Sequence, residues 1–317
     1  MPSKLSSPRA ESKPNERFRN RRKGSLKQYL DTVRQVLEHG SRKANRTGVD
    51  TLSRFNINYE IDLRQGFPLL TTKEISWKNI VVENLWFLSG ETHIDLLRRH
   101  GCKFWDPWAD ENGRVPSAYG NFWRHFPIHE DGQPRFNDQI RWVVDELKRN
   151  PNSRRLVVSA WTPGNTQTSA LPPCHALWVL NVQNTVEGEP LLCLHLTQRS
   201  CDVALGVPYN IAGYAFLLEL FARFSGIQAG ILGHTLIDAH IYTAKPDGTM
   251  AEYDHVPGLK EQITRTPRNL PTLRIDASIQ ALDDIPALLK AKTETLLAFF
   301  QLTGYEPHPA ISFKVAV

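Results

Sequence analysis

Two segments of the chain are apolar along most of a helix length. The longer one is YNIAGYAFLLELFARFSG (209–226), and the shorter one is KNIVVENLWFLSG (78–90). A helix that is apolar on most of its sides is buried rather than exposed to water. The first segment therefore predicts a long apolar helix, and the second predicts a buried helix that ends at Gly90. A chain with two such helices has to cover them with other elements, which requires a large core.

Strand patterns are interspersed with these helices in an irregular order. Residues 25–40 predict an amphipathic helix with Gly40 as its stop, whereas 175–183 and 190–200 predict a hairpin across the turn 185–190. Because the chain shows no regular strand–helix–strand repeat, it favours one mixed α/β domain of α+β character over a doubly wound fold. The strand segments are 45–63, 154–161, 175–183, 190–200 and 234–243.

The positive charge of the chain is concentrated at its N-terminus. The net charge is +5, whereas residues 1–24 alone hold eight Lys and Arg against two Glu. The rest of the chain therefore carries about one net negative charge, and a nearly neutral body does not indicate a nucleic-acid-binding domain. Residues 1–24 are rich in Ser, Pro and charge, which predicts a basic, disordered extension, with contact to RNA or an acidic surface as the alternative. Residues 25–317 are then the folded domain.

Composition also indicates the cellular setting. The apolar runs are shorter than the roughly 18–20 residues that span a bilayer, and the N-terminus shows no apolar signal segment. The four cysteines, at positions 102, 174, 193 and 201, form neither a C-x-x-C pair nor a disulfide framework. We expect a reduced, cytoplasmic protein that does not associate with membranes.

The segment LPPCHALW (171–178) places Cys174 behind two prolines and in front of a histidine. A catalytic cysteine needs a positive charge or a donor nearby, because the thiolate is the form that attacks. In a strand His175 points to the opposite face, so the two side chains need not meet. A zinc site has little support, since the chain lacks paired cysteine spacings and an H-E-x-x-H motif. These residues leave Cys174 as either a nucleophile or a core residue.

The segment QRSCDVALGVPYNIAGY (198–214) places polar residues in an apolar neighbourhood. A buried charge such as Arg199 or Asp202 needs a partner or a ligand. The guanidinium of Arg199 could bind a phosphate, and the amide of Asn210 could recognise an amide or imide edge. Gly206 would bring the backbone close to a ligand. The alternative is a structural Arg–Asp pair with a capping asparagine.

Other candidates also have ordinary structural explanations. Arg154 and Arg155 begin a strand and face opposite ways, and Arg46 lies on a turn, so all three could be surface arginines. The loops 104–113 and 117–126 concentrate Trp and Tyr, which suits either a flat heterocycle or a satellite hydrophobic cluster.

Taken together, these segments resemble the thymidylate synthase family from about Ser25 to Val317. The resemblance implies a single mixed α/β domain with a large mixed sheet flanked by helices, and a homodimer formed through the sheets. It implies the reductive methylation of dUMP to dTMP, with 5,10-methylenetetrahydrofolate as the donor of carbon and hydride, and no metal. The matching motifs are GFPLLTTK, ENLWFLSG, FWDPWADENG, AYGNFWR, NPNSRR, LPPCHALW, QRSCDVALGVPYNIAGYAFL, DAHIY and YEPHPAISFKVAV.

The resemblance also implies a role for each candidate residue. Cys174 matches the nucleophile that adds to carbon-6 of the uracil, and Arg199 would favour its thiolate. Glu83 matches an acid–base group that works through water on uracil O4, and Tyr119 a residue tied to proton removal at carbon-5. The implied catalytic set is Cys174, Glu83, Tyr119, Arg199, Asp202 and Asn210. The implied dUMP-binding set comprises Arg46, Arg199 and Ser200 at the phosphate, Arg154 and Arg155 reaching the phosphate from the partner subunit, His240 and Tyr242 at the ribose, Asn210 at uracil N3–H and O4, and Cys201 and Asp202. The implied folate-binding set is Trp105, Trp108, Asp202, Gly206, Tyr209 and Ala316, with Val317 in the same closing C-terminal segment.

The chain departs from the family pattern at several positions. Glu74 stands where a basic residue is common, which makes a loop that handles the acidic polyglutamate tail less positive. Ser76 stands where some members have a folate-contacting His, and Ile237 and Gly213 replace a common Gly and Ser. Between Tyr242 and DHVPGLK an insertion of about ten residues (243–252, TAKPDGTMAE) replaces the usual two, and we expect it to form a surface loop.

Two other functions compete with dTMP synthesis. A nucleotide hydroxymethylase of the same fold would form the same covalent adduct and trap it with water. Asn210 favours a uracil substrate, because cytosine-acting relatives tend to have Asp there, and Trp105 favours hydride transfer. The second alternative is an inactive RNA- or protein-binding member, against which the intact set of Cys174, Glu83, Asp202 and Asn210 argues.

Overall fold

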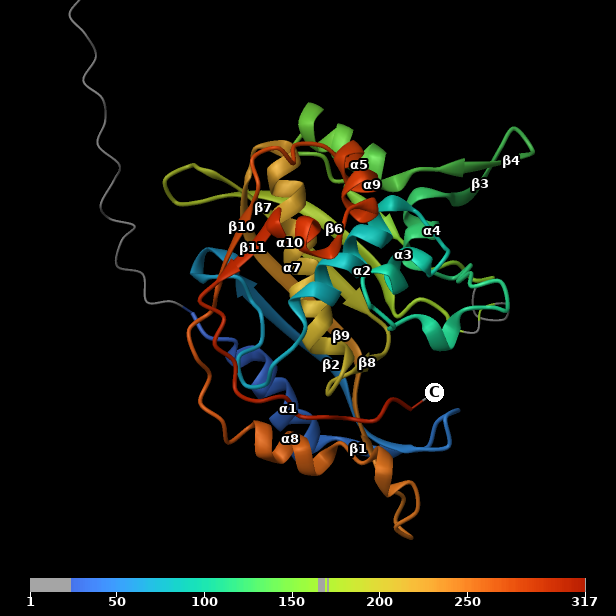
Figure 1. The fold of residues 1–317 in the computed structure, drawn as a ribbon, viewed down its shortest axis with the longest axis vertical. Coiled ribbons are helices and arrows are strands. Elements are labelled where there is room, and N and C mark those ends of the chain that lie inside the picture. Colours follow the sequence, from blue (N-terminus) through green and yellow to red (C-terminus); the bar gives the residue numbers. More distant parts are fainter. Residues whose placement is uncertain (1–23, 165–168, 170, 317) are drawn as a thin grey trace, which may run out of the picture.

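The computed structural model describes residues 24–164, 169 and 171–316, and shows a large sheet with helices packed on it (Figure 1). The predicted extension lies outside the described residues up to 23, as does Val317. Seven strands form the sheet in the order β1-β2-β9-β7-β6-β5, with β8 paired to β9. The strands are β1 (Ser41–Lys43), β2 (Asp50–Asp62), β5 (Val157–Ser159), β6 (His175–Asn184), β7 (Pro190–Gln198), β8 (Cys201–Asp202) and β9 (Gln228–Thr243).

The sheet is mixed, as the sequence predicts. Strands β6 and β7 form the expected antiparallel hairpin, and β2 pairs antiparallel with β9. Strand β9 runs parallel to both β7 and β8. The connection between β8 and β9 is the helix α7, so this part of the sheet is a parallel crossover inside an otherwise antiparallel arrangement.

The helices cover the sheet and one another. They are α1 (Lys27–His39), α2 (Trp77–Ser89), α3 (Asp95–Arg99), α4 (Tyr119–Arg124), α5 (Gln139–Arg149), α7 (Gly206–Ser225), α8 (Val256–Gln262), α9 (Ile285–Lys290) and α10 (Thr293–Ala298). One small hairpin and one antiparallel pair complete the described strands: the hairpin is β3 (Phe126–Glu130) with β4 (Gln133–Asn137), and the pair is β10 (Thr272–Ile275) with β11 (Phe300–Thr303).

The two apolar segments form the buried helices α2 and α7, which confirms both predictions. Trp86 in α2 and Phe216 and Phe221 in α7 are fully buried. Each helix ends at a glycine in the left-handed region, Gly90 and Gly226, where a residue without a Cβ adopts that conformation without strain. Burial of such large side chains stabilises the fold by about 1.5–3 kcal/mol each.

Helices α2 and α4 approach each other closely at Gly120. A Cβ built at Gly120 would lie 2.6 Å from the carbonyl oxygen of Phe87, and this backbone atom cannot turn aside as a side chain can. The contact matters for the site, because α4 carries Tyr119 and α2 carries Glu83.

We predict that Gly120→Ala lowers the free energy of unfolding by about 1–3 kcal/mol, because α4 has to move away from α2. Urea denaturation measures this loss. Gly164→Ala is a control for the exchange itself, since a Cβ at Gly164 meets no atom of the described residues within 4 Å. Equal stability of the two variants would show that the approach of α4 to α2 is not a tight one.

Candidate active site

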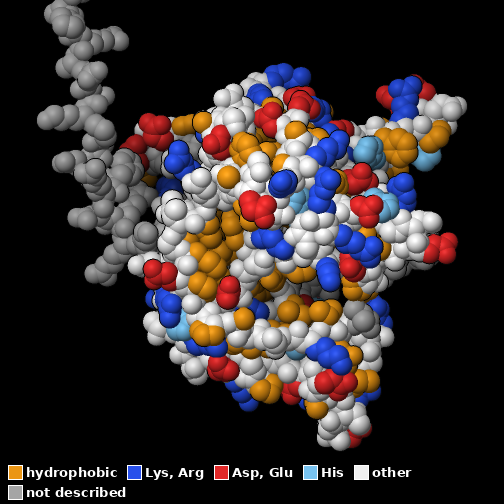
Figure 2. Space-filling model, in the orientation of Figure 1, with side chains coloured by type: hydrophobic (Ala, Val, Ile, Leu, Met, Phe, Trp, Pro, Cys, Tyr) orange, Lys and Arg blue, Asp and Glu red, His pale blue; other side chains and the backbone are white. Residues whose placement is uncertain are grey.

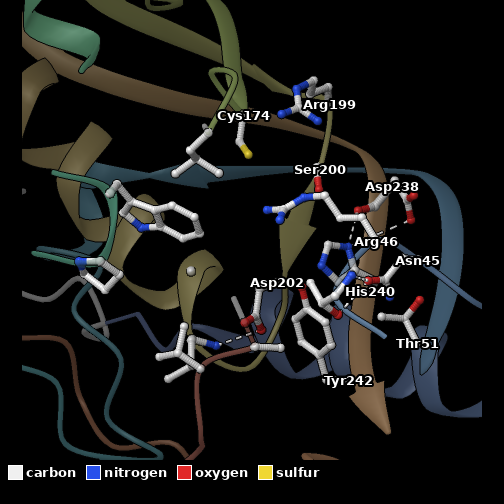
Figure 3. A pocket seen from close by; sticks show the side chains of 18 of the residues that line it. Asn45, Arg46, Thr51, Cys174, Arg199, Ser200, Asp202, Asp238, His240 and Tyr242 are labelled. Carbon is white, nitrogen blue, oxygen red and sulfur yellow. Dashed lines mark hydrogen bonds and ion pairs between the residues drawn. The ribbon is translucent and has the colours of Figure 1, made fainter. Parts of the chain in front are cut away.

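A cavity of about 580 Å³ opens beside the end of the sheet and collects side chains from distant parts of the chain. The face drawn in Figure 2 is hollowed between the upper and lower parts of the molecule. Figure 3 shows the labelled side chains around the cavity. The predicted site residues that line it are Arg46, Glu83, Trp108, Cys174, Arg199, Ser200, Asp202, Gly206, Tyr209, Asn210, His240, Tyr242 and Ala316.

Cys174 lies directly before β6 and its thiol lines the cavity (Figure 3). Burial raises the pKa of the thiol, whereas the charges of Arg199 and Arg46 and a hydrogen bond with Ser200 lower it. Burial is the largest of these effects, so the pKa stays above its ordinary value. The charge of Arg199 acts toward the thiolate, but the effect of desolvation on the thiol pKa is larger.

Arg199 is held beside Cys174 by the backbone of the two prolines. Its Nε donates to the carbonyl oxygen of Pro173 (3.0 Å) and one terminal nitrogen donates to that of Pro172 (2.6 Å). The amide of Arg199 donates to the carbonyl oxygen of Cys174 (2.9 Å), which joins the start of β6 to the end of β7. The guanidinium also lies over the ring of Trp161, 5.3 Å from its centroid.

Glu83 extends from the apolar helix α2 into the cavity wall. Its Oε1 accepts a hydrogen bond from the indole Nε1 of Trp105 (2.8 Å). Burial raises the pKa of Glu83 to about 7, although the indole hydrogen bond acts in the opposite direction. A carboxyl group with this pKa can both donate and accept a proton near neutral pH.

Tyr119 lies behind the cysteine rather than on the cavity surface. Its hydroxyl oxygen accepts from the backbone amides of Cys174 (3.0 Å) and His175 (3.2 Å). Its ring stacks on the imidazole of His175, with centroids 4.4 Å apart and planes 4° apart. Burial raises the pKa of Tyr119, so the phenol is neutral. In this arrangement Tyr119 fixes the backbone from which the Cys174 side chain extends.

A chain of buried polar side chains orients Asn210. Tyr59 bonds Nδ1 of His234 (2.8 Å), and Nε2 of His234 bonds the side-chain oxygen of Gln198 (2.6 Å). The amide nitrogen of Gln198 then donates to Oδ1 of Asn210 (3.1 Å). Burial lowers the pKa of His234 to about 3, so its ring is neutral and can donate through one nitrogen while accepting at the other. The direction of the Asn210 amide is thereby set before a ligand binds.

The side chain of Asp202 is likewise oriented by hydrogen bonds within the protein. Its Oδ1 accepts from the backbone amides of Ala204 (2.9 Å) and Leu205 (3.1 Å), and the second of these lies at the start of α7. A carboxylate at a helix N-terminus is stabilised by the helix dipole. The imidazole Nδ1 of His255 lies 4.0 Å from the same oxygen.

At the other end of the cavity, β1, β2 and β9 present side chains that the sequence did not single out. Lys43 forms an ion pair with Asp238 (2.8 Å), and Asp238 also accepts from the hydroxyl of Ser53 (2.5 Å). The Asp238 carboxylate lies 4.0 Å from Nδ1 of His240 (Figure 3). Asp238 is the first residue of the DAHIY motif, and a charged residue within a predicted strand is the feature by which the sequence could have indicated it as a site residue. Asn45, Thr47 and Thr51 line this end as well.

The remaining predicted residues lie away from the cavity lining. Trp105 contacts Glu83 from behind, and Cys201 is buried, with burial raising its pKa well above the ordinary value. Arg154 and Arg155 are exposed on the surface, in the turn before β5.

Among the described residues, no group of three or more His, Cys, Asp and Glu side chains is arranged to hold a metal ion. Within those same residues, no helix is long and apolar enough to cross a bilayer.

A half-buried thiol, a carboxyl group with a pKa near neutrality and a cluster of cationic side chains around one cavity define a mixed α/β enzyme that binds an anionic ligand. A model of the thymidylate synthase family matches residues 27–317. The chain is 40% identical to a thymidylate synthase of Haloferax volcanii over 345 residues, which covers 90% of this chain and 96% of that relative. The chain belongs to the thymidylate synthase family. It is thus a methyltransferase that forms dTMP from dUMP, with 5,10-methylenetetrahydrofolate as co-substrate.

We predict that Glu83→Gln changes the pH dependence of stability. The folded-state pKa of about 7 exceeds the ordinary value of 4.5, so the folded protein retains a proton that the unfolded chain has lost between these pH values. This carboxyl therefore makes the protein less stable as the pH rises toward 7, by about 1–3 kcal/mol in total. Urea denaturation from pH 5 to pH 8 should show that the variant gains stability relative to the unmodified protein over this interval.

Glu219→Gln is the matched control for this experiment. Glu219 lies in α7, and burial raises its pKa to about 7 as well, but it does not line the cavity. Both variants should lose the same part of the pH dependence, and Glu83→Gln should also lose at least about a hundredfold in kcat. A Glu83→Gln variant with full activity would exclude this carboxyl from catalysis.

Proposed function

We propose that the cavity holds dUMP and methylenetetrahydrofolate side by side, with Cys174 as the nucleophile. The observation that carries this proposal is that the Cys174 thiol, the Glu83 carboxyl and the Asn210 amide open into one cavity. Addition of the Cys174 sulfur to carbon-6 of the uracil moves an electron pair toward O4 and makes carbon-5 nucleophilic. When bound, the folate would supply the methylene carbon and the hydride. Its methylene–nitrogen bond would break, carbon-5 would lose its proton, and the Cys174 sulfur would leave carbon-6.

The end of the cavity near β9 suits the nucleotide's phosphate and ribose. Arg46, Arg199 and Ser200 offer donors for the phosphate, while His240 and Tyr242 lie within reach of a ribose hydroxyl.

Asn210 is the residue that we assign to base recognition. Its Oδ1 accepts a hydrogen bond from Gln198, which identifies the other end of the side-chain amide as Nδ2. Nδ2 is a donor, and a donor fits the O4 oxygen of uracil. Oδ1 keeps a second lone pair for the N3–H of the base. Cytosine presents an amine and an unprotonated ring nitrogen at these positions, which this arrangement does not match.

Glu83 and Tyr119 complete the proposed proton chemistry. Glu83 would exchange protons with uracil O4 through water, because its pKa of about 7 makes both forms available. Tyr119 bonds the amides of Cys174 and His175. It would therefore keep the nucleophile in place while the proton at carbon-5 leaves.

The apolar end of the cavity fits the pterin and aryl rings of a folate. Trp108 and Tyr209 line it, and the ring of Phe104 packs edge-on against Tyr209 with centroids 5.0 Å apart. Asp202 offers a carboxylate to the donor groups of a pterin, and Gly206 leaves room beside it, where a Cβ would lie 3.4 Å from Oδ1 of Asn210. Trp105 would act through Glu83, and Ala316 would belong to the segment that closes over the ligands.

We also propose a homodimer in which Arg154 and Arg155 reach the partner's phosphate site. Both side chains are exposed and lie outside the chain's own cavity. Apolar side chains on three strands of the sheet are exposed as well, namely Phe55, Val157 and Leu177. Such side chains support burial of this sheet face against a second copy.

Two smaller proposals accompany this function, one on domains and one on the cellular setting. Residues 25–317 would form the catalytic domain, with residues 1–24 as a basic extension that turnover does not require. The four free cysteines fit a reduced, cytoplasmic setting. Neither rival function is favoured: a hydroxymethylase would release hydroxymethyl-dUMP and tetrahydrofolate, and an inactive RNA- or protein-binding member would release no product.

The decisive experiment incubates the protein with dUMP and methylenetetrahydrofolate, follows dihydrofolate by absorbance and weighs the nucleotide product by mass spectrometry. We predict dTMP with an equal amount of dihydrofolate, and loss of both in Cys174→Ser by at least about four orders of magnitude. The variant should still bind dUMP, because its phosphate and base contacts are unchanged. Turnover in Cys174→Ser near that of the unmodified protein would place the nucleophile elsewhere.

Asn210→Asp should shift the preference from dUMP toward dCMP. The protonated or ionised carboxyl can accept from the exocyclic amine of cytosine, whereas it loses the amide donor to uracil O4. We expect the ratio of kcat/KM for dUMP over dCMP to fall by at least about a hundredfold. An unchanged ratio would remove Asn210 from base recognition.

A further inference from the structure

The end of the chain lies across the lower part of the molecule and reaches the cavity. Figure 1 shows the C-terminal segment passing beside α8. Its residues Val315 and Ala316 line the cavity. The contacts of Phe313 and Lys314, which precede them, therefore fix the position of this edge of the cavity.

His255 anchors the segment from within the protein. It is 1% exposed, and its Nε2 donates to the carbonyl oxygen of Lys314 (2.9 Å). The other nitrogen, Nδ1, is buried without a hydrogen-bond partner among the described residues and faces Asp202 at 4.0 Å. The imidazole thus lies between the C-terminal segment and the carboxylate proposed to bind the pterin.

Phe313 adds an apolar anchor one residue earlier. Its ring centroid lies 5.0 Å from that of His255, and Nζ of Lys73 lies 4.6 Å above the ring. A Cβ at Gly258 in α8 would lie 2.8 Å from the Phe313 ring, so the segment packs directly on the helix backbone.

The third anchor comes from the inserted segment 243–252. After β9 the chain turns back through hydrogen bonds between Lys245 and Thr249, and a 3-10 turn, η4 (Ala251–Tyr253), follows. Oε1 of Glu252 lies 3.7 Å from Nζ of Lys314, and the same Nζ lies 4.2 Å from the ring centroid of Tyr253. The insertion is thus more than a surface loop, because it ends against the C-terminal segment.

We propose that Glu252, Tyr253 and His255 are positioning residues that hold Lys314, and with it Val315 and Ala316, at the edge of the cavity before the folate binds. The inference rests on the proposed function, since it assigns a purpose to the segment that closes over the folate. A segment that is already in place loses less conformational freedom when the ligand arrives. The anchors therefore strengthen folate binding without taking part in the chemical step.

The anchors differ in their expected strength. The Glu252–Lys314 pair is half exposed, with side-chain exposures of 55% and 53%, so water screens much of its attraction. The His255 imidazole that makes the other hydrogen bond is itself buried, and its loss leaves the Lys314 carbonyl without this donor. We expect a small effect from the surface pair and a larger one from the imidazole.

The first test is a double-mutant cycle with Glu252→Gln, Lys314→Gln and the double variant. Each single change should raise the KM for methylenetetrahydrofolate about twofold to fivefold, with kcat and the Kd for dUMP within about twofold of the unmodified values. The KM of the double variant should be only slightly higher than that of the single variant with the larger effect, because both changes remove the same interaction. Glu130→Gln is the control, since the Glu130–Arg135 pair of the β3–β4 hairpin is equally exposed (57% and 59%).

The second test follows hydrogen exchange in the C-terminal peptide of the unliganded protein. His255→Ala should speed exchange of residues 314–316 and raise the folate KM about tenfold or more. His255→Gln, which keeps a donor for the Lys314 carbonyl, should recover most of both losses. If His255→Ala does not fold, the surface variants at Glu252 and Lys314 still test the proposal.

Unchanged exchange and folate KM in all of these variants, in a protein that makes dTMP, would overturn the positioning role. A protein that makes no dTMP would instead refute the proposed function, and the exchange experiment would still report whether the anchors hold the segment. A KM increase of equal size in Glu130→Gln would show a general charge effect and would likewise overturn the assignment.

Discussion

The parallel pairing of β8 with β9 is the constraint on which the site depends. It sets Cys201 opposite Ala239 and Asp202 opposite His240, so the two motifs that carry polar residues meet at one end of the sheet. The crossover between them is α7, whose apolar surface requires burial on nearly every side. The same burial that fixes α7 therefore fixes Asn210 and Gly206 at its start. A core helix and a binding residue are here two parts of one element.

The sequence predicted the elements better than it predicted their partners. Apolar helices such as α2 and α7 are recognisable because every side of them must be buried, and β6 and β7 because a short turn joins them. The meeting of Arg199 with Cys174 was not predictable from the residues alone, since it depends on the carbonyls of two prolines and on strand pairing 25 residues apart in the chain. Family resemblance supplied the set of site residues, but not the networks that orient them. Gln198 and His234 look like ordinary strand residues until the sheet register brings them together.

Burial is the dominant electrostatic influence in this cavity. It raises the pKa of the Cys174 thiol against two arginines, and it raises that of Glu83 against an indole hydrogen bond. The thiol form of Cys174 is therefore favoured in this cavity, whereas the carboxyl group of Glu83 can exchange its proton near neutral pH. A thiol is less prone to oxidation than a thiolate.

The same dependence on burial explains why the edge of the cavity matters. The effects of Arg199 and Arg46 on the thiol grow as water leaves, because the attraction between charges is stronger where the surroundings are less polarisable. Val315 and Ala316 stand at the boundary between the cavity and water. The anchors proposed in the insertion after β9 and in His255 therefore act on this boundary, and through it on folate binding, rather than on the chemical step.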